Sequence, residues 1–133
     1  MPAARPSSLV SLKRRAEFLR VRGGSRCATP LFVLEAKPRE ADNAAATKQA
    51  RFGFTVTKRL GKAVDRNRIK RRLRAAVRDV QMHHARPGFD YVVVARLAAR
   101  DTVYATLVGD MAKALERVHE APRDRRGKTG TTR

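Results

Sequence analysis

The sequence predicts an α+β fold, a two-layer sandwich in which helices pack on one small, mostly antiparallel sheet. Residues 51–57 alternate between apolar and polar side chains, and residues 89–95 (FDYVVVA) are the most β-prone run, so both are expected to be strands. Residues 66–84 and 103–118 repeat apolar side chains at steps of three and four, as amphipathic helices do. Such elements in the order α-β-β-α-β-α favour one layered domain over residues 1–121.

The N-terminal part is expected to hold one helix. Residues 1–10 are predicted to be loose, and Ser11 is predicted to cap a helix that continues to about Val21. Leu12, Ala16 and Leu19 recur at helical spacing and are assigned to its inward face. The glycine pair at 23–24 should end this helix, because glycine readily adopts the left-handed conformation beyond a helix terminus.

Two strands and a loop follow. Residues 31–36 read as a strand, with a short extra strand near Cys27, and the polar, Ala-rich residues 38–49 read as a surface loop. The alternation over 51–57 gives that strand an apolar face and a polar face. The apolar side holds Phe52, Phe54 and Val56, and the polar side holds Arg51, Thr55 and Thr57.

The helix that ends near residue 84 is basic. Asp65 is expected to cap it, and its inward stripe is Ile69, Leu73, Ala76, Val77 and Val80. The roughly opposite arc holds Asn67, Lys70, Arg71, Arg74 and Arg78. In the last helix the inward residues are Leu107, Met111, Ala114, Leu115 and Val118. Residues 122–133 form a basic, Gly- and Thr-rich segment that is expected to be a disordered tail.

The charge of the chain points to a polyanionic partner. Lysine and arginine number 31 and the acids 12, so the net charge is 31 − 12 = +19. A membrane surface is the weaker alternative, because the basic helix carries no Trp or Phe to insert at the interface. One cysteine, no transmembrane-length apolar run and no signal-peptide pattern favour a soluble, cytoplasmic protein.

The positive charge is concentrated in residues 58–74, KRLGKAVDRNRIKRRLR. This stretch holds nine Lys or Arg against one acid, an excess of 9 − 1 = 8 charges. Arginine presents a planar fork suited to phosphate oxygens. The acids that would pair these cations along the helix are nearly absent, so nucleic-acid contact is favoured over a solvated charged face.

This stretch also resembles the signature of the bacterial ribonuclease P protein subunit. In that family a Lys-x-x-Gly-x-Ala-Val lead-in precedes an Arg-Asn-Arg core, here Lys58, Gly61, Ala63, Val64 and then 66–68. The resemblance implies the ribosomal protein S5 domain 2-like fold, with a left-handed βαβ crossover that carries the basic helix. The ordinary rule for such crossovers predicts a right-handed one.

The resemblance implies a function in maturation of the 5′ end of tRNA. The RNA subunit would catalyse removal of the 5′ leader from precursor tRNA and hold the Mg²⁺ ions, and the protein would bind both RNAs, with no obligate protein partner evident. The residues expected to face the catalytic RNA are Lys58, Arg59, Lys62, Arg66, Asn67, Arg68, Lys70, Arg71 and Arg74.

A second RNA surface is implied for the single-stranded leader, in a cleft between the basic helix, the first helix and the open face of the sheet. Asn67, Lys70 and Arg74 would border both surfaces. The residues expected in the cleft are Phe18, Arg22, Val33, Arg51, Thr55 and Thr57. Phe18 has two open interpretations, base stacking and core packing.

The chain departs from the family pattern at two cleft positions. Family members often carry aromatic residues where this chain has Arg22 and, by our alignment, Glu35. A carboxylate among phosphates is unfavourable, so Glu35 either points elsewhere or the alignment slips by one residue. With seven Phe and Tyr in the chain, leader contact should depend more on charge than on stacking.

The sequence contains no catalytic constellation and no metal site of its own. Its acids are scattered, its three histidines lie at predicted helix ends, and Cys27 lacks ligand spacing. Three other classes remain open: a structural or ribosomal RNA-binding protein, a DNA-binding module and a protein-only nuclease. The DNA-binding reading is weaker, because the basic face has few residues that read base edges.

Overall fold

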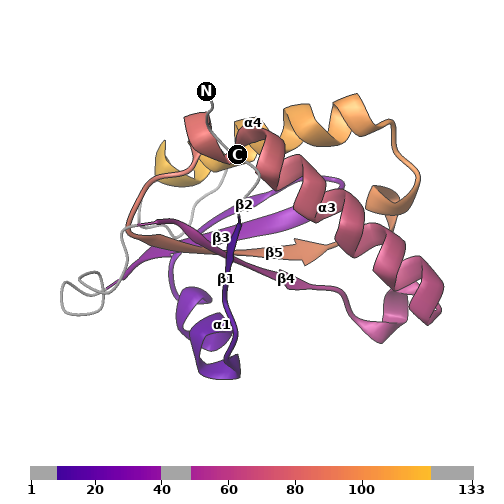
Figure 1. Ribbon diagram of the computed structural model, residues 1–133, viewed down its shortest axis with the longest axis horizontal. Coiled ribbons are helices and arrows are strands. Elements are labelled where there is room, and N and C mark those ends of the chain that lie inside the picture. The colour runs from indigo at the N-terminus through magenta and orange to yellow at the C-terminus, as the bar shows by residue number, and fades with distance from the viewer. Residues whose placement is uncertain (1–8, 40–48, 121–133) are drawn as a thin grey trace.

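The computed structural model describes residues 9–39 and 49–120, which form one sheet with helices on both faces (Figure 1). The strands are β1 (Val10–Ser11), β2 (Ser25–Ala28), β3 (Phe32–Pro38), β4 (Arg51–Thr55) and β5 (Phe89–Ala95). The helices are α1 (Arg15–Val21), α3 (Ala63–His84), α4 (Tyr104–Glu120) and the short 3₁₀ helices η1 (Lys58–Leu60) and η2 (Leu97–Arg100). The α+β prediction is confirmed, and β5 has the predicted bounds.

The sheet is mixed, with strand order β1-β4-β5-β3-β2. β4 pairs in parallel with β1 and with β5, whereas β3 pairs antiparallel with β5 and with β2. The sheet is therefore less antiparallel than predicted, because β1 adds a second parallel pair. In Figure 1, β4 lies nearer the viewer than its parallel neighbour β5 and α3 passes above both, so the βαβ connection is left-handed, as the resemblance implies.

Helices α3 and α4 cover one face of the sheet and bury the main core (Figure 1). Every residue that the sequence assigned to the inward stripes of these two helices is buried. On the sheet, Phe52 and Tyr91 stack with ring centroids 4.8 Å apart. The period-3.6 pattern therefore predicted this layer correctly, because both helices are long enough to show the pattern clearly.

Helix α1 lies on the opposite face of the sheet (Figure 1). It packs through Phe18 and Val21 against Leu12 and Val92. The predictions for this helix are partly wrong. It begins at Arg15, and Ser11 belongs to β1 instead of capping a helix. Of the predicted inward residues, Ala16 is exposed and Leu19 is 44% exposed. The predicted stripe was anchored on Leu12, which precedes the helix, whereas Phe18 and Val21 are the residues that pack on the sheet.

Helix α3 begins two residues before Asp65, so Asp65 does not cap it. Lys62 holds the N-cap position, and Asp65 lies in the first turn, where a carboxylate is favoured by the helix dipole. Its Oδ1 atom pairs with Arg100 Nη1 at 3.5 Å. Most of the predicted loop at 38–49, residues 1–8 of the segment predicted to be loose, and the predicted tail at 122–133 lie outside the described residues. The prediction of a loose segment is wrong at Val10, which pairs with β4 as part of β1.

Candidate nucleic-acid interface

The outward face of α3 is cationic, as the sequence predicted. Asn67, Lys70 and Arg71 are exposed. The guanidinium carbon of Arg74 lies 5.7 Å from the centre of the Phe54 ring, a cation–π contact that holds this side chain against β4. The face therefore combines free cations with one that is fixed in place.

Arg68 and Arg72 turn toward η2. Arg68 Nε donates to the Arg100 carbonyl oxygen at 3.0 Å, and its side chain remains 48% exposed. Arg72 Nε donates to the Ala99 carbonyl oxygen at 3.0 Å, and its Nη2 donates to that of Thr102. Arg72 therefore secures the segment between η2 and α4, whereas Arg68 also remains accessible to a ligand.

The turn before α3 extends the cationic surface. Lys58, Arg59 and Lys62 are exposed, and Arg66 Nε donates to the Gly61 carbonyl oxygen at 3.2 Å. Gly61 has φ +127°, and a Cβ atom there would lie 2.9 Å from Asp65 Oδ2. Only glycine fits this turn without strain, which accounts for the Gly in the lead-in.

The other face of the sheet carries a groove of about 520 Å³ beside α1. Its lining is Arg15, Phe18, Leu19, Arg22, Arg26, Glu35, Thr55, Thr57, Val92 and Val94. Four predicted cleft residues are among them: Phe18, Arg22, Thr55 and Thr57. Glu35 also lines the groove, so it does not point elsewhere.

Other predicted features of the cleft differ in the structure. Val33 is 5% exposed and pairs with Val94 without lining the groove. Helix α3 contributes no lining residue, so Asn67, Lys70 and Arg74 do not border the groove. The reason is topological, since α1 and α3 pack on opposite faces of the sheet.

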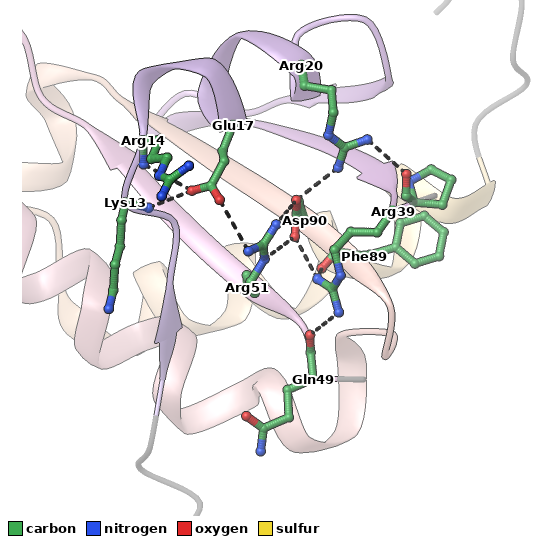
Figure 2. Close-up of polar contacts among 10 residues, drawn as sticks. Lys13, Arg14, Glu17, Arg20, Arg39, Gln49, Arg51, Phe89 and Asp90 are labelled. Carbon is green, nitrogen blue, oxygen red and sulfur yellow. Dashed lines mark hydrogen bonds and ion pairs between the residues drawn. The ribbon is translucent and has the colours of Figure 1, made fainter. Parts of the chain in front are cut away.

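Arg51 is also absent from the groove, because it binds an aspartate (Figure 2). Asp90 is fully buried, and both of its oxygens accept from Arg51 at 2.8 Å. Arg39 Nη1 donates to Asp90 Oδ1 at 2.7 Å, and Arg20 Nη2 donates to Oδ2 at 2.9 Å. Arg51 Nη1 also pairs with Glu17 at 3.3 Å. We call these five residues the Asp90 cluster.

The Asp90 cluster joins α1, β4, β5 and the residue that follows β3 at one end of the sheet (Figure 2). Burial alone would raise the pKa of Asp90, but hydrogen bonds from Arg51, Arg39 and Arg20 outweigh burial and lower it. Three arginines against two acids leave 3 − 2 = +1 charge here. The sequence did not reveal this cluster, because its members are far apart in the chain and follow no periodic pattern.

His84 and His119 contact neighbouring side chains, and no histidine lines the groove. Tyr91 Oη lies 2.5 Å from His119 Nε2 and accepts from the Arg86 backbone N–H at 2.8 Å. His84 Nδ1 lies 2.5 Å from Glu116 Oε2. Within residues 9–39 and 49–120, no group of three or more His, Cys, Asp or Glu is placed to hold a metal ion. No helix in this described part is long and apolar enough to span a bilayer.

Comparisons with known proteins agree with this arrangement. A family model described as Ribonuclease P matches residues 7–119. The ribonuclease P protein component of Brucella suis is 43% identical over 110 residues, covering 80% of this chain and 78% of that protein. That of Gluconacetobacter diazotrophicus is 44% identical over 107 residues, covering 80% and 88%.

Solved structures show the same fold. The RNase P protein of Staphylococcus aureus matches with a TM-score of 0.66 and 27% identity, over 83% of this chain and 95% of that chain. The RNase P protein of Thermotoga maritima matches with a TM-score of 0.67 and 25% identity, over 80% and 96%. The cationic helix, the groove and these similarities agree, and the chain belongs to the ribonuclease P protein family.

Proposed function

We propose that this chain is the protein subunit of a ribonuclease P in which the RNA subunit catalyses 5′ maturation of tRNA. In this proposal the protein binds the ribonuclease P RNA through α3 and η1, and binds the 5′ leader of precursor tRNA in the groove beside α1. Mg²⁺ would be held mainly by the RNA, and the assembly would work in the cytoplasm.

The observation that carries this proposal is the continuity of the two surfaces. The groove reaches Thr57, two residues beyond the end of β4, and Thr57 is followed at once by the exposed Lys58 and Arg59 of η1. The chain then enters the cationic face of α3 at Lys62. A leader that leaves the groove at this end therefore meets cations that also suit the catalytic RNA.

The groove suits a single-stranded sugar–phosphate chain. Arg15, Arg22 and Arg26 are exposed along it and supply cations, Thr55 and Thr57 supply hydroxyls, and the ring of Phe18 offers a stacking surface. Mature tRNA lacks a leader, so binding energy gained in this groove would favour substrate over product. Neutralisation of phosphates would also lower the Mg²⁺ concentration that the holoenzyme needs.

Cleavage of precursor tRNA at low Mg²⁺ tests the proposal. Three reactions are compared: a bacterial ribonuclease P RNA alone, this protein alone, and the two together. We expect efficient cleavage only in the combined reaction. Cleavage by the protein alone would reveal a catalytic site in the chain. RNA binding without stimulation would instead indicate a structural RNA-binding protein.

A further inference from the structure

Strand register places an acidic residue within the groove, opposite its aromatic wall. Gly53 of β4 pairs with Val92 of β5, Val92 pairs with Glu35 of β3, and Glu35 pairs with Arg26 of β2. These four residues form one row across the α1 face of the sheet. The ring of Phe18 covers Gly53, since a Cβ atom there would lie 2.4 Å from Phe18 Cε2.

The row fixes the distance between the aromatic ring and the carboxylate. Neighbouring strands lie about 4.8 Å apart, so the Cα atoms of Gly53 and Glu35 are separated by about 10 Å. The apolar floor between them is Val92 and Val94. A planar base that lies on this floor beside Phe18 would direct one edge toward Glu35.

The Glu35 carboxylate is available to a ligand. Its side chain is half-buried, and within residues 9–39 and 49–120 it makes no hydrogen bond or ion pair, even with its cross-strand neighbour Arg26. A phosphate beside Glu35 would be repelled, so the backbone of a bound strand must follow the arginines and not this position. An ionised carboxylate only accepts hydrogen bonds, which a base edge with N–H groups can donate.

Guanine is the base that matches this acceptor best. Its Watson–Crick edge presents two adjacent donors, N1–H and the 2-amino group, and these can meet the two oxygens of one carboxylate. Adenine and cytosine each present one amino donor beside an acceptor nitrogen, and uracil presents one N–H between two carbonyl oxygens. Single-stranded RNA exposes these edges to protein side chains.

We propose that Glu35 is a specificity-determining residue that makes the groove prefer guanine at one position of the 5′ leader. This inference rests on the proposed function, because it requires the leader to occupy the groove. Phe18 would contact the face or edge of the base, and Arg15, Arg22 and Arg26 would hold the flanking phosphates. The site would then combine charge-based binding with recognition of one base.

The test uses the reconstituted holoenzyme at low Mg²⁺ and precursor tRNAs with uridine leaders. A single guanosine is moved through the leader positions, and kcat/KM is measured by competition against the all-uridine leader. Wild type is compared with Glu35→Gln, which has nearly the same shape but cannot offer two acceptor oxygens. Glu120→Gln, at an exposed position at the end of α4, is the matched control for loss of one negative charge.

We expect guanosine at one position to raise kcat/KM about tenfold with wild type and Glu120→Gln, and much less with Glu35→Gln. Inosine at that position lacks the 2-amino group, so with wild type it should lose most of the rise in kcat/KM that guanosine gives. With Glu35→Gln, inosine and guanosine should differ little. If Glu35→Gln raises kcat/KM equally on every leader, Glu35 acts only by repelling phosphates, and the inference is overturned. A guanosine preference that persists in Glu35→Gln, or that the RNA alone displays at high Mg²⁺, would overturn it as well.

Failure of this inference is distinguishable from failure of the proposed function. If wild-type protein stimulates cleavage of all leaders without a base preference, only the role of Glu35 is lost. If it stimulates cleavage of none, the subunit proposal is lost too.

Discussion

Phe18 illustrates how one side chain can serve both packing and binding. Its ring packs with Leu12, Val21 and Val92, and the same ring lines the groove. The sequence left core packing and base stacking as alternatives, but the half-buried position is compatible with both. The contact depends on Gly53, where the absence of a side chain lets the ring lie directly against the backbone of β4.

Gly53→Ala should therefore destabilise the protein through Phe18. The added methyl would lie 2.4 Å from Cε2 and 2.5 Å from Cζ of the ring, so the ring must move off the strand. We expect a loss of about 1–3 kcal/mol in the free energy of unfolding, measured by urea denaturation. In a Phe18→Ala background the same substitution should cost much less, because Leu12 Cδ1, which would lie 3.0 Å from the added methyl, is the end of a flexible side chain. Losses that simply add in the double variant would contradict the contact.

His119 is the second residue with a defined physical consequence. Burial and, secondarily, the positive charge of Arg86 lower the pKa of His119 from 6.5 to about 4. The geometry explains this direction: Tyr91 Oη accepts from the Arg86 N–H and so donates its own proton to His119 Nε2, which must be neutral to accept it.

The pH dependence of stability follows from that shift. Between pH 6.5 and 4 the unfolded state binds a proton at His119 that the folded state does not, so stability is complete above 6.5 and falls as the pH decreases to 4. Because the side chain is partly exposed, we expect this loss of stability to be about 1 kcal/mol in the wild-type protein. His119→Gln, whose side chain does not titrate, should not show it. Urea midpoints at pH 7 and pH 5 for both proteins measure the difference. Equal pH dependence in both would contradict the shift.

At the scale of elements, the Asp90 cluster attaches α1 to the sheet. Helix α1 has only seven residues and cannot be stable alone. Glu17 accepts from the backbone N–H groups of Lys13 and Arg14 at 2.8 and 3.0 Å, and Arg20 reaches Asp90. The wall of the groove therefore depends on a buried carboxylate at one end of β5.

Asp90→Asn should loosen this wall and destabilise the fold. It leaves three arginines around a neutral side chain, and breaking a buried ion pair costs about 3–5 kcal/mol. Urea denaturation should show a loss of that order, and hydrogen exchange should show α1 opening more easily. Asp101→Asn, at an aspartate 65% exposed, is the matched control, with an expected loss below about 0.5 kcal/mol. Similar losses in the two variants would remove Asp90 from this role.

The stability that the Asp90 cluster contributes depends on pH in a predictable direction. Because the pKa of Asp90 is lowered in the folded state, its contribution is complete at neutral pH and is lost only as the pH falls below about 4. The cluster is therefore expected to remain ionised over the whole physiological range.

Helix α3 offers two neighbouring arginines with different roles. Arg71 is exposed on the cationic face, whereas Arg72 donates to the carbonyl oxygens of Ala99 and Thr102. Arg71→Ala should reduce the slope of log affinity for ribonuclease P RNA against log salt by about one. Arg72→Ala should lower the free energy of unfolding by about 1–2 kcal/mol and leave that slope unchanged. Filter binding over a salt series measures the slope, and urea denaturation measures the stability, so the two experiments separate the roles of Arg71 and Arg72. Equal slopes for wild type and Arg71→Ala would remove Arg71 from the interface.

At the scale of the whole molecule, the sequence predicted what repeats locally and missed what depends on distant pairing. The inward stripes of α3 and α4 were correct, because both helices are long periodic runs, and the bounds of β5 were correct, because residues 89–95 are a continuous β-prone run. The two-residue β1 forms only through parallel pairing with β4, and its formation shifts the start of α1. The groove required the register of four strands, so Thr55 and Thr57 were found from alternation but Arg26 was not.

The net charge of +19 leads to a prediction for the whole molecule, because unneutralised cations repel one another across α3 and η1. Sulfate that binds this surface should stabilise the folded state by mass action, and we expect the Tm to rise by roughly several degrees over millimolar sulfate at constant ionic strength. The Lys70→Ala/Arg71→Ala variant should show a smaller rise, measured by thermal denaturation. An equal rise in both proteins would mean that sulfate acts through general exclusion from the protein surface and not through this face. A smaller rise in the variant would instead locate anion binding on the helix that we propose to face the catalytic RNA.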